Sequence, residues 1–232
     1  MSGKEFVVFC DFDGTITTQD TGNVIIDACI GTEERQRLDD QILDGTKSFT
    51  EANNEMWKGV TFKTFEDAIA VCTANNVSHD PGFKRFHTIL SKHNVSLKVV
   101  SAGLFPIVQL YLKDYTNVEI FANTCTITTT DEGIPVWTIN YVDDSPSGHD
   151  KGAPIRKLKQ EYKEKGLTDE ERPKILFIGD GVSDLTAARD ADFVFAKHGK
   201  DLETYVKREG IEAVVWDDFH FICDWLEKWL KI

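Results

Sequence analysis

The chain has 232 residues, of which 41% are hydrophobic and 28% are charged, as in ordinary soluble globular proteins. Its formal net charge of -13 excludes long-range attraction to nucleic acid or to anionic membranes, because both are polyanions. The five cysteines are scattered without a C-x-x-C pair, and the first apolar run is too short for a signal sequence or a membrane span. These features favour a cytoplasmic protein, and we expect a monomer or homodimer.

The first predicted element is a strand over residues 6–10, a β-branched and aromatic run that stops at an aspartate. The stretch 17–80 that follows is far longer than an ordinary connection and has helical patterns at 22–30, 49–57 and 65–76. We interpret it as an inserted α-helical cap that governs substrate specificity. Residues 1–16 and 81–232 would then form the catalytic core.

The remaining chain alternates between helical patterns and short apolar runs. A helix over 82–93 opens with Asp80-Pro81, and a strand follows over 97–101. Alternation on both sides of Asp131-Glu132-Gly133 predicts a short β-hairpin between 119 and 142. Later helices are predicted at 153–165 and 219–231, and later strands at 174–179, 193–196 and 213–216. This order predicts an α/β fold with a Rossmann-like doubly wound parallel sheet.

Reactive side chains follow the predicted strands, at the sheet edge where ligands gather in such folds. Asp11 directly follows the first strand, and Gly14 and Thr15 allow a tight turn whose amides a phosphoryl group can approach. A carboxylate that attacks a phosphate ester needs a cation, fixed donors for the phosphoryl oxygens and an acid for the leaving alkoxide. We therefore interpret Asp11 as a nucleophile and Asp13 as the general acid and base.

The other strand ends supply the remaining groups. Ser101 can donate a hydrogen bond to the phosphoryl group, beside the amides of Ala102 and Gly103. Lys151 opens a predicted helix and brings a compact positive charge. Hard carboxylate oxygens for Mg²⁺ are available at Asp180 and Asp184, and Ser183 lies beside them as a candidate phosphate contact.

Each of these features also has an ordinary structural explanation. Asp, Gly and Thr are common in turns, Ser101 could cap a helix, Lys151 could be a solvated surface charge and Asp184 could cap the helix that follows it. The ordered set, with each motif at a strand end or a helix start, argues against that explanation. His149 is better interpreted as a loop histidine that orients its neighbours than as a base.

The segments DFDGT, VVSAG, HDKG and GDGVSD, in this order, resemble the motifs of the haloacid dehalogenase-like phosphatases, and the resemblance spans residues 6 to about 197. It implies that Asp11 is the nucleophile and Asp13 the acid and base. It also implies that Mg²⁺ is bound by Asp11, the backbone carbonyl of Asp13 and Asp180, with Asp184 a more distant or water-mediated ligand. The substrate would be a small phosphorylated metabolite.

A cap after the first motif resembles the branch that contains phosphoserine phosphatase and a methionine-salvage phosphatase. Asp20 stands where the phosphoserine enzymes have a substrate-binding glutamate, and no arginine lies between Arg37 and Arg85 to bind a substrate carboxylate. The segments GHDK, GDGVSDL and FAKHGKDL resemble fungal polyol phosphatases, so a polyol or sugar phosphate is the leading substrate class. Phosphoserine, a methionine-salvage phosphate, a phosphomutase and a non-catalytic phosphate sensor remain alternatives.

Overall fold

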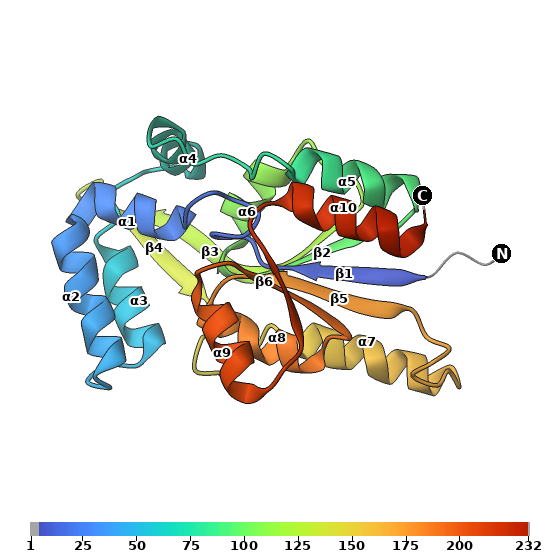
Figure 1. Ribbon diagram of the computed structural model, residues 1–232. Coiled ribbons are helices and arrows are strands. Elements are labelled where there is room, and N and C mark those ends of the chain that lie inside the picture. Colours follow the sequence, from blue (N-terminus) through green and yellow to red (C-terminus); the bar gives the residue numbers. More distant parts are fainter. Residues whose placement is uncertain (1–4, 232) are drawn as a thin grey trace.

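The computed structural model describes residues 5–231, and its core is one seven-stranded sheet between two layers of helices (Figure 1). The strands lie in the order β4-β3-β2-β1-β5-β6-β7, and all neighbours are parallel except the antiparallel pair β3 and β4. The predicted α/β fold with a doubly wound sheet and a hairpin extension is therefore confirmed. The strands are β1 (Phe6–Cys10), β2 (Leu97–Leu104), β3 (Val118–Thr129), β4 (Pro135–Asn140), β5 (Lys174–Gly179), β6 (Phe193–Lys197) and β7 (Ala213–Trp216).

Alternate side chains of the central strands enter different cores, as expected for strands buried on both faces. Val8 and Cys10 of β1 pack with α5 (Phe83–Lys92) and α10 (Phe219–Leu230) on one face of the sheet. Phe9 points to the opposite face, towards α7 (Ala153–Glu164), α8 (Leu185–Asp190) and α9 (Asp201–Glu209). The central strands are thus fixed from both sides, which fixes the positions of the loops at their ends.

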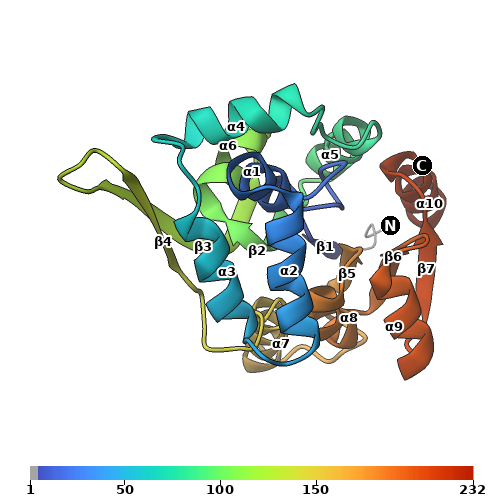
Figure 2. The ribbon, with the colours of Figure 1, turned by 90° about the vertical axis from the view of Figure 1, so that its left-hand side faces the viewer.

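Four helices lie between β1 and α5, namely α1 (Thr21–Ile30), α2 (Thr32–Leu43), α3 (Phe49–Lys58) and α4 (Phe65–Ala74). Figures 1 and 2 show α1, α2 and α3 at the end of the sheet towards which β1 runs. The chain leaves and re-enters the core side by side, because Thr17 and His79 form an isolated antiparallel bridge. Within residues 5–231, no helix combines the length and the apolar character needed to cross a membrane.

The β3–β4 hairpin joins the sheet to these four helices. Trp137 of β4 stacks on Trp57 of α3 with ring centroids 5.2 Å apart, and its indole N–H donates to the Phe62 carbonyl at 2.9 Å. The Tyr141 hydroxyl, just after β4, is bonded to α3 as well: it accepts from Asn53 Nδ2 at 3.0 Å. A separate apolar cluster, built from both the helices and the hairpin, closes this interface.

Most predicted elements agree with the structure, and the differences are local. β1 and β5 have the predicted bounds, whereas β2 continues to Leu104 past the predicted end at residue 101. The sequence patterns do not predict α2, α6 (Phe105–Leu112) or α9. Only Leu38 is buried in α2, which explains why this helix has no apolar stripe long enough to recognise.

Candidate active site

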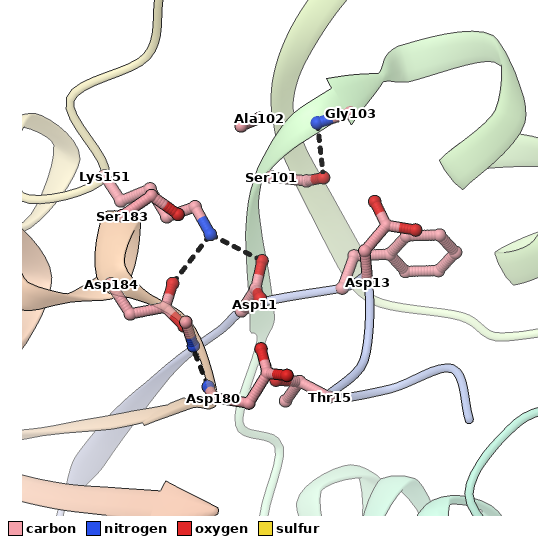
Figure 3. A network of polar contacts seen from close by, with 12 residues as sticks. Asp11, Asp13, Thr15, Ser101, Ala102, Gly103, Lys151, Asp180, Ser183 and Asp184 are labelled. Atoms are coloured by element: carbon pink, nitrogen blue, oxygen red, sulfur yellow. Dashed lines mark hydrogen bonds and ion pairs between the residues drawn. The ribbon is translucent and has the colours of Figure 1, made fainter. Parts of the chain in front are cut away.

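The carboxyl ends of β1, β2 and β5 meet at one edge of the sheet, and the segment before α7 joins them (Figure 3). This arrangement follows from the strand order, because parallel neighbours end on the same side. It brings Asp11, Ser101, Lys151 and Asp180 together from positions far apart in the sequence. The convergence expected from the motifs is present in the structure.

Lys151 lies between two carboxylates in a buried ion-pair network. Its Nζ donates to Asp11 Oδ1 at 2.7 Å and to Asp184 Oδ1 at 2.6 Å, and all three side chains are almost completely buried. Burial alone would lower the pKa of Lys151, but the charges of Asp11 and Asp184 outweigh it and raise the pKa above its ordinary value. Lys151 therefore carries a positive charge in this network at any ordinary pH.

Both carboxylate oxygens of Asp184 accept hydrogen bonds, Oδ1 from Lys151 and Oδ2 from the loop after β5. Its second oxygen, Oδ2, accepts from the backbone amides of Asp180 at 2.8 Å and Gly181 at 2.9 Å. Asp184 therefore folds the loop after β5 around itself, in addition to holding Lys151. Ser183 precedes it in the short 3-10 helix Val182–Asp184.

Asp11, Asp180 and Asp184 form a compact carboxylate group. One oxygen from each lies within 4.8 Å of the others. Burial, followed by the charge of Asp184, raises the pKa values of Asp11 and Asp180, while Lys151 opposes this shift. Three carboxylates beside one ammonium leave an excess of negative charge on hard oxygen ligands, which suits a divalent cation such as Mg²⁺.

The turn after β1 is built for close approach to Asp180. Gly14 has a φ of +75°, and a Cβ atom there would lie 2.5 Å from Asp180 Oδ2. The hydroxyl of Thr15 donates to Asp180 Oδ1 at 3.3 Å. Glycine at position 14 thus permits both the left-handed backbone and the contact with Asp180.

Asp13 projects to the opposite side of the turn, towards Gly103 (Figure 3). Its Oδ1 accepts from the amide of Thr21 at 2.8 Å and from the Thr21 hydroxyl at 2.7 Å. Burial and the nearby charge of Asp20 raise the pKa of Asp13 to about 7, against the lowering effect of the Thr21 bonds. A carboxyl group with such a pKa can give or take a proton near neutral pH.

The pairing of β2 with β3 is irregular between Ser101 and Leu104, and Gly103 in this irregular end of β2 faces Asp13. The Gly103 amide donates to Ser101 Oγ at 2.9 Å, and a Cβ on Gly103 would lie 2.7 Å from Asp13 Oδ2. His149 supports this end of β2, because its Nδ1 lies 2.7 Å from the Ser101 carbonyl oxygen, as expected for an orienting histidine. The carbonyl of Ala102 accepts from Asn123 Nδ2 at 2.8 Å.

Three residues at this site were not identified from the sequence: Thr21, Asn123 and Lys197. Thr21 begins α1 and holds Asp13, whereas buried Asn123 links Ala102 to the amide of Val142. Lys197 ends β6 and donates to the Gly14 carbonyl at 2.7 Å. Thr21 and Asn123 belong to none of the quoted segments. Lys197 lies in the segment FAKHGKDL and at a strand end, which was a usable signal.

Asp20, the candidate substrate contact, and the two asparagines of α3 have different environments. Asp20 is exposed, and its Oδ1 caps α1 by accepting from the Asn23 amide at 2.7 Å. The side chains of Asn53 and Asn54 are instead engaged by the Tyr141 hydroxyl. These two asparagines therefore support the hairpin interface in this structure.

The 17–80 segment has no arginine after Arg37, but Arg35 and Arg37 themselves lie within it, on α2. Arg35 donates to Asp27 Oδ1 at 2.6 Å and to Asp39 Oδ2 at 2.7 Å. Arg37 pairs with Glu34, with 2.7 Å between Nη2 and Oε1. Both guanidinium groups are thus already paired with acidic residues of the same segment.

Comparison with known proteins agrees with this geometry. Residues 8–189 match the family model of the haloacid dehalogenase-like hydrolases. The chain is 35% identical over 220 residues to polyol phosphate phosphatase PYP1 of Saccharomyces cerevisiae, covering 92% of this chain and 89% of that protein. It is also 28% identical to the 2-hydroxy-3-keto-5-methylthiopentenyl-1-phosphate phosphatase of Bacillus cereus, with 97% of each chain covered.

The fold has similar solved structures. A phosphoserine phosphatase bearing an analogue of its phospho-aspartyl intermediate superposes with a TM-score of 0.68 at 17% identity, covering 96% of this chain and 99% of that chain. This likeness concerns the fold alone, whereas the family match spans most of the described chain. The protein belongs to the haloacid dehalogenase-like hydrolases, and within them it is a phosphatase that hydrolyses phosphoric monoesters.

Proposed function

We propose that the protein hydrolyses small polyol or sugar phosphates through a phosphoryl group carried on Asp11. A carboxylate oxygen of Asp11 attacks phosphorus, and the bond from phosphorus to the substrate oxygen breaks. The carboxyl proton of Asp13 moves to that oxygen, so the alcohol leaves in neutral form. The observation that carries this proposal is the placement of Asp11 beside Lys151, with Asp13 on the other side of the same turn.

The second half of the reaction reverses the role of Asp13. The Asp13 carboxylate takes a proton from a water molecule as the water oxygen attacks the phosphorus of the aspartyl phosphate. The acyl phosphate bond breaks, which releases inorganic phosphate and the Asp11 carboxylate. A pKa of about 7 suits Asp13 to both directions of proton transfer.

Other residues would bind the phosphoryl oxygens and a cofactor. Ser101, Lys151 and the amides of Gly14, Thr15, Ala102 and Gly103 are the proposed phosphoryl donors, with Ser183 beside them. Asp11, the Asp13 carbonyl and Asp180 would bind Mg²⁺, with Asp184 supporting them. Bound Mg²⁺ would offset the negative charge that accumulates when a carboxylate meets a phosphate.

We propose that residues 17–80 act as a cap over the core formed by residues 1–16 and 81–232. The bridge between Thr17 and His79 supports this division, because both connections pass through one narrow point. A second bond at this point joins the Thr18 amide to the Ser78 carbonyl at 2.8 Å. Asp20 caps α1, the first helix of the proposed cap, and is the proposed contact for substrate hydroxyl groups.

Two observations favour an uncharged polyol or sugar as the leaving group. A relative with 35% identity over most of both chains is named a polyol phosphate phosphatase. The two arginines of the proposed cap are paired internally, so neither offers a free fork to a substrate carboxylate. Phosphoserine is therefore the less favoured substrate.

The test is a panel of phosphorylated metabolites assayed for phosphate release with Mg²⁺. Ribitol and sorbitol phosphates should give higher kcat/KM values than phosphoserine. Faster release from phosphoserine would contradict the substrate proposal. The methylthiopentenyl phosphate belongs in the panel because a relative covering 97% of this chain is named for it. Chromatography of the products separates hydrolysis from a phosphomutase reaction, which would leave phosphate on an isomer.

A further inference from the structure

The segment from Lys197 to Leu202 contacts the catalytic loops at two points. Nζ of Lys197, the last residue of β6, donates to the backbone carbonyl of Gly14 at 2.7 Å. Five residues later, the amide of Leu202 donates to the backbone carbonyl of Asp180 at 2.9 Å. One segment therefore supports both the turn after β1 and the loop after β5.

The position of Lys197 is fixed by its surroundings. Its Nζ lies 5.0 Å from the ring centroid of Trp216, a fully buried residue at the end of β7. The amide of His198 donates to the Trp216 carbonyl at 2.8 Å, which holds the start of the segment against the same residue. The ammonium group is thus held at the turn rather than free in solvent.

The Gly14 carbonyl, which accepts the hydrogen bond from Lys197, belongs to the turn that contacts Asp180. Gly14 lies in the turn between Asp11 and Thr15, and it has no Cβ to separate it from Asp180. A shift of the Gly14 backbone would change the contact of this turn with Asp180. Asp11 and Asp180 lie on these two neighbouring segments, and one oxygen from each lies within 4.8 Å of the other and of one oxygen of Asp184.

We propose that Lys197 is a positioning residue that holds the catalytic turn against Asp180 and so sets the spacing of the three carboxylates. This inference rests on the cation site of the proposed function. Two simpler roles compete with it: a positive charge that merely tunes the local field, and packing against Trp216. The three roles give different effects on cation affinity.

The direction in which cation affinity changes when Lys197 is replaced distinguishes a positioning role from a purely electrostatic role. Removing a positive charge near a cation site strengthens cation binding, because less repulsion remains. Removing a hydrogen bond that positions the ligands weakens it, and outer contacts of this kind are worth about 10- to 100-fold in metal affinity. Lys200 is a matched control, because it is exposed on the same segment, and its charge, like that of Lys197, acts on Asp180.

The experiment measures the Kd of Mn²⁺, used as a spectroscopic probe for Mg²⁺, by electron paramagnetic resonance on the purified full chain. Lys197→Met keeps the apolar stem beside Trp216 and should raise the Kd by about tenfold or more. Lys200→Met should leave the Kd unchanged or lower it slightly. Lys197→Arg restores a donor and should recover most of the affinity.

Each outcome decides between the roles. Folded Lys197→Met with unchanged or tighter Mn²⁺ binding overturns the proposal. If Lys197→Met and Lys197→Arg both fail to fold while Lys200→Met folds, Lys197 serves stability and the proposal is wrong. Asp180→Asn separates this test from the proposed cation site itself: if the wild type and Asp180→Asn bind Mn²⁺ alike, the site is misassigned irrespective of Lys197.

Discussion

At the scale of single residues, the two aspartates of one turn have different surroundings. Asp11 is paired with Lys151, whereas Asp13 is held by Thr21 and has a pKa of about 7. In the proposed reaction, this difference would allow Asp11 to act as the nucleophile while Asp13 exchanges protons. The two proposed roles differ because Asp11 contacts Lys151, whereas Asp13 contacts Thr21 at the start of α1.

Asp13→Asn should reduce steady-state kcat with a polyol phosphate by about 10²- to 10⁴-fold, because the acid and base are lost. p-Nitrophenyl phosphate has a leaving group that needs no proton, so its first phosphoryl transfer should survive. Rapid-quench kinetics should then show a burst of p-nitrophenol followed by slow turnover. Asp131→Asn, the same change in the exposed turn between β3 and β4, is the control.

A result that would count against this role is equal loss of the burst and of turnover. It would place Asp13 in the attack on phosphorus or in the fold of the turn. Circular dichroism of the variant separates those two explanations.

Individual site residues differed in how readily the sequence revealed them. Asp11 and Asp180 could be predicted because each follows a strand run in a motif of small residues. Thr21 and Lys197 could not, because their roles depend on contacts across the fold. A threonine at a helix start and a lysine at a strand end are ordinary surface features until the tertiary structure places them.

At the scale of elements, the β3–β4 hairpin fixes the position of α3. The Tyr141 hydroxyl contacts Asn53, Asn54 and the Thr50 carbonyl at 3.0, 3.2 and 3.3 Å. The same ring lies against Gly148, where a Cβ would be 2.3 Å from it. Tyr141 therefore connects α3 to the loop that leads to Lys151.

Tyr141→Phe removes the hydroxyl and keeps the ring, so it should cost about 1–2 kcal/mol of unfolding free energy. Urea denaturation measures this loss, and hydrogen exchange should become faster in the amides of α3. The control is Tyr162→Phe on α7, since the hydroxyl of Tyr162 has no hydrogen bond within residues 5–231. Unchanged exchange in α3 would mean that the Trp137 contacts alone hold the helix.

A second element-scale prediction concerns the pair Arg172 and Asp192, which ties the start of β5 to the chain before β6. Arg172 donates to both oxygens of Asp192 at 2.6 and 2.8 Å, and the Ile175 amide donates to Oδ2 at 2.7 Å. Partial burial raises the pKa of Asp192, but these hydrogen bonds outweigh it and lower the pKa below its ordinary value.

A lowered pKa in the folded state means that this contact stabilises the protein above the unfolded value of about 3.9, and that the stabilisation is lost as the pH falls through the folded value. Asp192→Asn should therefore cost about 1 kcal/mol at pH 7, and the gap to wild type should narrow below about pH 4. Urea titrations at several pH values measure this difference in unfolding free energy between the wild type and Asp192→Asn. A gap independent of pH would show that the charge of Asp192 is irrelevant.

Element boundaries were predictable where local patterns and packing agreed. β1 and β5 are short, wholly apolar runs with clear ends, and their predicted bounds agree with the structure. α2 is mostly polar, with Glu33 and Glu34 in its first turn, so its stability depends on packing that its own sequence does not reveal. β2 runs past Ser101 because pairing with β3 extends it.

At the scale of the whole molecule, an acidic chain also gathers three carboxylates at its candidate active site. The chain carries a net charge of -13, yet its substrate is an anion. Lys151 alone cannot balance Asp11, Asp180 and Asp184. Activity should therefore be lost on treatment with EDTA and restored by Mg²⁺ in excess of the chelator.

The same treatment should lower the thermal midpoint of unfolding if a cation occupies the site, because a ligand that binds only the folded state stabilises it. Asp180→Asn is the control, and its midpoint should not respond to Mg²⁺. Full activity after exhaustive chelation would contradict the metal requirement.

The central claim is that Asp11 carries the phosphoryl group during turnover. The direct measurement is to mix Asp13→Asn with ³²P-labelled p-nitrophenyl phosphate, whose leaving group needs no proton, and Mg²⁺. The mixture is then quenched in acid and digested with pepsin, and the labelled peptide is identified by mass spectrometry. We predict label on Asp11, in the peptide containing Asp11-Phe12-Asp13→Asn-Gly14, and no label in the double variant Asp11→Asn, Asp13→Asn. Label at another residue, or undiminished turnover by Asp11→Asn alone, would contradict the account.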